Sequence, residues 1–109
     1  MTGAEKLYAA MAALGIPGTR LAYPEGKAPS PPFFVYELDD PGQLFADNAE
    51  CAAIPRYRVQ LLEKYGDPEL QEKVFKALTD EFGAVSHYED WSESEHCSIT
   101  SYYLNALDD

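Results

Sequence analysis

Apolar side chains recur along this chain with two different spacings, which separate the segments expected to be strands from those expected to be helices. Between residues 56 and 62 apolar and polar side chains alternate, as in a strand with one buried face. Between residues 68 and 82 the apolar positions recur every three or four residues, as on one face of a helix. Asp67 is placed to cap this helix at its start, and Gly83 is placed to end it.

Similar signals predict the remaining elements. Thr2 and Glu5 have the spacing of a capping box, which would start a helix over residues 3–14. The further strands are expected at residues 21–23 (a short edge strand), 33–38, 85–91 and 97–107. In the last of these, apolar residues fall on both faces, which requires either a bulge or a strand that is buried on both sides.

These elements together predict a single α+β domain over residues 1–109. It has about four main strands in a mainly antiparallel sheet, with two helices packed on one face. The strand at residues 33–38 is apolar on both sides, so we expect a neighbouring subunit or sheet to cover its second face. The strands are joined by a loop at residues 24–32, a turn at residues 39–42, and an exposed arm at residues 43–53.

Composition narrows the classes of partner. Hydrophobic residues make up 46% of the chain and aromatic residues 13%, which supports a packed core in spite of a net charge of −11. Nineteen acidic side chains against eight basic ones would repel nucleic-acid phosphates and anionic lipid headgroups. No apolar run approaches the length of a membrane span or a signal peptide, so we expect a protein made in the cytoplasm, without contact to a membrane.

The residues able to bind a metal are few and poorly spaced. His96 and Cys97 would point to opposite faces of a strand, so they could not easily hold one ion. His87 follows no pattern that would make it a general base, and Cys51 and Cys97 form neither a CxxC pair nor a disulfide framework. We therefore expect two reduced, buried thiols, no metal site and no cofactor.

The acidic residues around the turn between the last two expected strands give little support for an enzyme. Glu89 and Asp90 are more simply a solvated pair than an acid and base, because a catalytic pair needs burial to separate the two pKa values. We expect no catalytic residue and no enzyme. A small metal-dependent or carboxylate-dependent enzyme that uses Glu89, Glu93 and His96 is the competing hypothesis.

A subunit interface is the best-supported kind of site. Arg56 and Arg58 lie two residues apart on one strand face, where they either form ion pairs across the sheet or meet an acidic patch of a neighbouring subunit. In the exposed arm, Phe45 is the only large aromatic residue and lies close to Asp47 and Asn48. These five residues are the predicted interface.

Four short phrases occur along the chain in an order that resembles one family of proteins. They are Ser-Pro-Pro-Phe at residues 30–33, Phe-Ala-Asp-Asn at 45–48, Arg-Tyr-Arg-Val-Gln-Leu at 56–61 and Asp-Pro-Glu-Leu-Gln-Glu-Lys-Val at 67–74. In this order they resemble the small tail-completion or tail-terminator proteins of long-tailed, non-contractile bacteriophages and prophages. The chain departs from that pattern at residues 61–65, where a longer segment replaces a short polar turn.

The resemblance implies a structural protein of the virion, assembled in the host cytoplasm. Its subunits would form a ring, expected to be a hexamer, which caps the tail tube and meets the head connector protein. DNA would pass through the ring without specific binding, and an acidic wall suits this passage. The alternatives are a neck or head-tail joining protein of the same virion, and a small acidic adaptor or inhibitor of a basic host protein.

Overall fold

The computed structural model describes residues 2–40 and 54–106. Within these residues two helices and five strands follow one another: α1 (Gly3–Ala12), β1 (Gly18–Arg20), β2 (Phe33–Asp40), β3 (Arg56–Glu63), α2 (Pro68–Phe82), β4 (Val85–Ser92) and β5 (Cys97–Asn105). Neither helix has the length and hydrophobicity of a membrane span.

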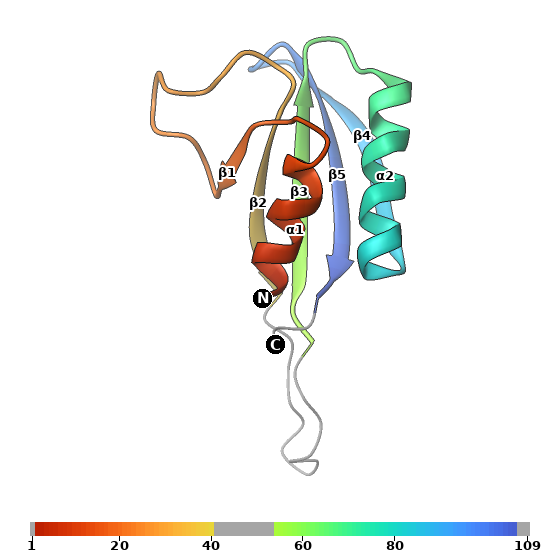
Figure 1. Ribbon diagram of the computed structural model, residues 1–109. Helices are drawn as coiled ribbons and strands as arrows, with labels where there is room; N and C mark the ends of the chain where they lie inside the picture. Colours follow the sequence, from red (N-terminus) through yellow and green to blue (C-terminus); the bar gives the residue numbers. More distant parts are fainter. Residues whose placement is uncertain (1, 41–53, 107–109) are drawn as a thin grey trace.

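The strands form one sheet in the order β1-β2-β3-β5-β4. β1 runs parallel to β2, and all the other neighbours are antiparallel. Figure 1 shows α1 and α2 in front of the same face of this sheet. The predicted α+β class, with a mainly antiparallel sheet and two helices on one face, is therefore confirmed. The sheet has five strands because the short edge strand joins the four main ones, and the parallel pairing of that edge strand was not expected.

The short edge strand lies at Gly18–Arg20 and not at residues 21–23. Leu21 has a φ of 65°, in the left-handed region, and this conformation takes the chain out of the strand direction. Gly18 is needed for the pairing with β2, because a Cβ atom at this position would lie 2.2 Å from the ring of Phe34. The apolar character of residues 21–23 was thus a misleading signal.

Both helices begin at the predicted caps. Thr2 and Glu5 form the capping box of α1, which ends at Ala12, two residues before the predicted end. In α2, the Asp67 side chain accepts hydrogen bonds from the backbone N–H groups of Glu69 and Leu70. Gly83 follows the helix with a φ of 87°, so the predicted bounds of α2 are confirmed.

The hydrophobic core lies between the helices and one face of the sheet. Its buried members are Leu7, Met11, Ile16, Phe34, Tyr57, Val59, Leu61, Val74, Leu78, Tyr102, Leu104 and Ala106. The alternation predicted for β3 is confirmed, because Tyr57, Val59 and Leu61 all point into this core.

Two strands differ in detail from their predictions. β5 pairs continuously with β3 and β4, so it has no bulge. Every second residue from Ser98 to Leu104, on the helix side, is buried, and on the other side Cys97 and Ser101 are buried too. β2 continues to Asp40 through an irregularity between Leu38 and Asp40, where the sequence predicted a turn from residue 39. Arg56 pairs with this extension, and its ion pair with Asp39 favours the longer strand.

Candidate interaction surface

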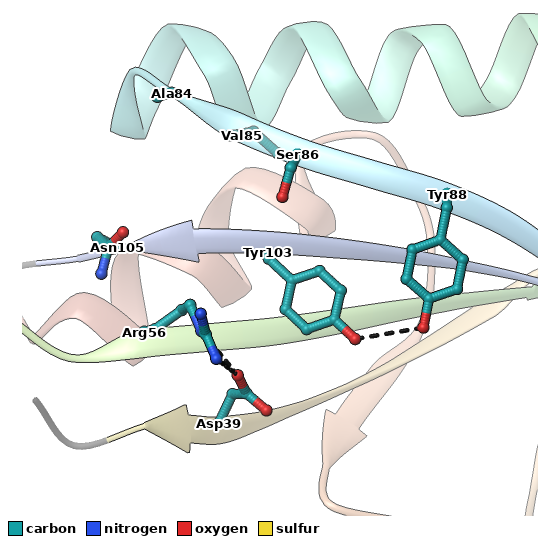
Figure 2. Close-up of a pocket in the computed structure, with 8 residues that line it drawn as sticks. All are labelled: Asp39, Arg56, Ala84, Val85, Ser86, Tyr88, Tyr103 and Asn105. Atoms are coloured by element: carbon teal, nitrogen blue, oxygen red, sulfur yellow. Dashed lines mark hydrogen bonds and ion pairs between the residues drawn. The ribbon is translucent and has the colours of Figure 1, made fainter.

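Neither helix covers the second face of the sheet, which we call the open face. Alternation along the strands places on it Val35, Glu37, Asp39, Arg56, Arg58, Gln60, Ser86, Tyr88, Ile99 and Tyr103. Figure 2 shows this side, with the side chains in front of the strands and a helix behind them. At one end of the face the ring of Tyr23 packs edge-on against Phe33, with 5.5 Å between the ring centroids.

Both predicted interface arginines lie on the open face and are paired within the chain. The Nε atom of Arg56 donates to Asp39 Oδ2 at 2.7 Å, and its guanidinium lies 5.8 Å from the centre of the Tyr103 ring. Arg58 forms an ion pair with Glu37, its direct neighbour on β2. The ion-pair interpretation of the two arginines is therefore confirmed, and their contact with another subunit stays a prediction.

Two tyrosines extend this polar row to the edge of the sheet. The rings of Tyr88 and Tyr103 are stacked at 6.1 Å, and their hydroxyl oxygens lie 3.4 Å apart. The hydrogen bond with Tyr88 raises the pKa of the Tyr103 hydroxyl, and partial burial adds to this effect. Tyr88 itself is 55% exposed, so a large amphipathic ring projects from the open face.

A wide hollow of about 700 Å³ lies over this part of the open face (Figure 2). Its lining residues are Asp39, Arg56, Ala84, Val85, Ser86, Tyr88, Tyr103 and Asn105. Neither a histidine nor a cysteine is among them, and the charges of Arg56 and Asp39 are already matched. The hollow suits contact with a protein surface, which uses exposed tyrosines and arginines, better than acid-base chemistry.

Phe45, Asp47, Asn48 and Cys51 lie outside the described residues. Within the described part of the chain, no three histidine, cysteine or acidic side chains are arranged to hold a metal ion.

The two histidines lie in different surroundings. His96 is exposed in the β4–β5 hairpin with a φ of 51°, three residues after the exposed Glu93 in sequence. The ring of His87 packs against Phe75 and Tyr102, with centroid distances of 4.6 and 5.4 Å. His87 is thus an exposed residue with aromatic contacts that the sequence did not indicate.

Cys97 is a buried, free thiol, as predicted. Burial raises the pKa of this thiol, and the nearby Glu95 carboxylate adds to the shift. A raised pKa keeps the sulfur protonated and therefore weakly nucleophilic.

Sequence reasoning missed a polar network at the other end of the sheet, on the helix side. The amide nitrogen of Gln71 donates to Glu63 Oε1 at 2.9 Å and to Glu89 Oε2 at 2.7 Å. The Ser98 hydroxyl donates to the same Glu89 oxygen at 2.7 Å. Glu63 continues the alternation by which every second residue of β3 points to the helices, and it is only 4% exposed. An acidic residue at such an inward position was the one sign in the sequence that a polar network would be found there.

The two carboxylates of this network differ in their proton affinity. Burial raises the pKa of Glu63, whereas hydrogen bonds from Ser98 and Gln71 lower the pKa of Glu89. The sequence paired Glu89 with Asp90, but alternation places these two on opposite faces of β4. Asp90 instead accepts a hydrogen bond from the backbone N–H of Trp91 at 2.9 Å.

Comparison of the chain with protein-family models, with curated proteins and with solved structures gives no match.

Proposed function

We propose that this protein is a structural subunit of a long-tailed bacteriophage or prophage, which assembles into a ring that caps the completed tail tube and joins it to the head connector. The order of the four sequence phrases supports the family. The structural observation that carries the proposal is that, among the described residues, helices cover only one face of the sheet, and the open face ends at an exposed edge strand.

The edge strand β4 is the feature best suited to subunit contact. Six of its eight residues are exposed, and it pairs with β5 on one side only within the described chain. Unpaired strand edges readily bind a further chain. The opposite edge is the three-residue strand β1, so the two edges of the sheet are different surfaces. Contacts between unlike surfaces generate rings when the rotation between subunits closes.

Charge supports the rest of the proposal. A net charge of −11 suits a channel wall through which DNA passes without being held. In this proposal the ring belongs to the virion and assembles in the host cytoplasm. The same charge also fits the alternative of an acidic adaptor. An adaptor would bind basic proteins strongly, and salt would weaken that binding.

The test is the molar mass of the protein in solution, measured by size-exclusion chromatography with light scattering over a wide range of concentration. We expect a ring-sized species, either from the protein alone or after addition of tail-tube protein. The proposal would be contradicted if the protein is a monomer at every concentration and does not bind tail-tube protein. Binding to the head connector protein without binding to tail-tube protein would favour the neck protein.

Variants test which residues form the contact between subunits. Tyr88→Asp, on the open face, and Phe45→Asp, in the predicted arm, should shift the assembled species toward the monomer. Lys76→Glu, at an exposed position of α2, is the control and should leave assembly unchanged. The double change Arg56→Glu and Arg58→Glu should also weaken assembly, but it places like charges beside Asp39 and Glu37, so its folding must be checked by circular dichroism.

A further inference from the structure

A second hollow, separate from that on the open face, lies where the loop between β3 and α2 meets the β4–β5 hairpin. Its volume is about 320 Å³, and its lining residues are Tyr65, Glu89, Asp90, Trp91 and Ser98. Figure 1 shows this loop and this hairpin at the same end of the molecule. We call this hollow the hairpin pocket.

Two exposed aromatic rings belong to the hairpin pocket. Tyr65 is 80% exposed and Trp91 is 44% exposed, although burial of such rings is normally favourable. Aromatic rings attract cations to their faces, and the ammonium of Lys64 already lies 5.5 Å from the centre of the Tyr65 ring. The aromatic part of the pocket is therefore suited to a positively charged group.

Glu89 supplies a fixed negative charge in the same pocket. Its Oε2 atom accepts two of the three hydrogen bonds of the network, one from Gln71 and one from Ser98. No hydrogen bond to its Oε1 atom comes from the described residues, so this oxygen keeps its capacity to accept one. The two donors hold the carboxylate in place, and they lower its pKa, so that it is ionised at neutral pH.

Gly66 makes room for this carboxylate. It has a φ of 73°, and a Cβ atom at this position would lie 2.5 Å from Glu89 Oε2 and 3.3 Å from Ser98 Oγ. A residue with a side chain would displace Glu89 from its two donors. The backbone of the loop thus places the carboxylate beside the aromatic rings.

We propose that the hairpin pocket binds a basic side chain, arginine or lysine, of a partner polypeptide. The cation lies against the rings of Tyr65 and Trp91 and donates a hydrogen bond to Glu89 Oε1. Aromatic rings with a carboxylate recognise a guanidinium or ammonium group by cation–π attraction and a charge-assisted hydrogen bond. The site lies where the β3–α2 loop meets the β4–β5 hairpin. The proposal for this pocket does not rest on the proposed ring.

The test uses Trp91, the only tryptophan of the chain, as a built-in reporter. N-acetylarginine amide is titrated into the whole protein while tryptophan fluorescence is recorded, and N-acetylcitrulline amide serves as the neutral probe of the same shape. We expect a saturable change with the arginine probe and none with the citrulline probe. No saturable change, or an equal change with both probes, would overturn the proposal.

Matched variants separate the pocket from the overall acidity. Glu89→Gln should weaken binding of the arginine probe by about fivefold or more, because it removes a charge-assisted hydrogen bond. Glu25→Gln removes the same charge from an exposed position outside the pocket and should leave binding unchanged. Lys64→Gln should strengthen binding, since it removes a competing cation from the Tyr65 ring. Unchanged binding by a folded Glu89→Gln protein would also overturn the proposal.

Measuring self-association of the Glu89→Gln variant shows which protein supplies the basic side chain. If a second copy supplies it, Glu89→Gln weakens self-association together with probe binding. If a different protein supplies it, self-association stays the same while probe binding is lost. A protein that binds the probe and stays monomeric with tail-tube protein would contradict the proposed function and leave the pocket intact.

Discussion

At the scale of single residues, the two carboxylates that share Gln71 act on stability in opposite directions. The folded state raises the pKa of Glu63 above its ordinary value of 4.5, so the stability from this residue is present at low pH and is lost as pH rises through the folded pKa. The folded state lowers the pKa of Glu89, so the stability from this residue is present above 4.5 and is lost as pH falls through the folded pKa.

Two substitutions therefore have opposite expected effects. At neutral pH, Glu63→Gln should raise the free energy of unfolding, because it removes a buried charge and keeps an acceptor for Gln71. Glu89→Gln should lower it by about 0.5–1 kcal/mol, since the lost hydrogen bonds to a charge are partly screened by solvent. Urea denaturation followed by circular dichroism measures the free energy of unfolding of each variant. The difference of each variant from the unchanged protein should shrink below pH 4.5. Effects of equal sign at neutral pH would contradict the assigned pKa directions.

At the scale of elements, the sequence predicted those that carry their own signals. The caps at Asp67 and Gly83 and the apolar stripe between them predicted α2 to the residue. β1 was misplaced because a three-residue parallel strand depends on its pairing with β2, and neighbouring residues do not encode that pairing. The extension of β2 to Asp40 likewise depends on Arg56, a residue of another strand.

The same distinction applies to the candidate sites. Alternation was enough to place Arg56 and Arg58 on one face, since both lie on one strand. The contact of Gln71 with Glu63 and Glu89 joins residues that are 8 and 18 positions apart, on α2, β3 and β4. Only the packing of α2 against the sheet brings these three side chains together, so no local pattern could predict them.

The cap of α2 gives a prediction at this scale. Asp67→Ala should lower the free energy of unfolding by about 1 kcal/mol, because two backbone N–H groups at the start of the helix lose their acceptor. Asp80→Ala is the matched control, since it removes an exposed acid near the other end of α2, where a negative charge is unfavourable. Thermal unfolding measured by circular dichroism compares the two variants. Asp80→Ala should therefore cause no loss, and an equal loss in both variants would contradict the capping role of Asp67.

At the scale of the whole molecule, the net charge of −11 opposes the assembly that the open face and the β4 edge favour. Copies of a strongly acidic protein repel one another. Salt screens this repulsion, so that at 0.1 M it is largely lost beyond about 10 Å. Contacts through strand edges and tyrosines depend far less on salt. Self-association should therefore strengthen as salt rises, seen in sedimentation velocity as growth of the oligomer at fixed protein concentration.

The opposite salt dependence would identify a different joint. If a basic side chain of one copy occupies the hairpin pocket of the next, salt weakens that contact, and added salt would dissociate the oligomer. Glu89→Gln separates the two cases. A joint made by the open face and strand edge keeps its strengthening with salt in this variant, whereas a joint made through the pocket is already weak at low salt. The sign of the salt effect thus tells which surface carries the assembly.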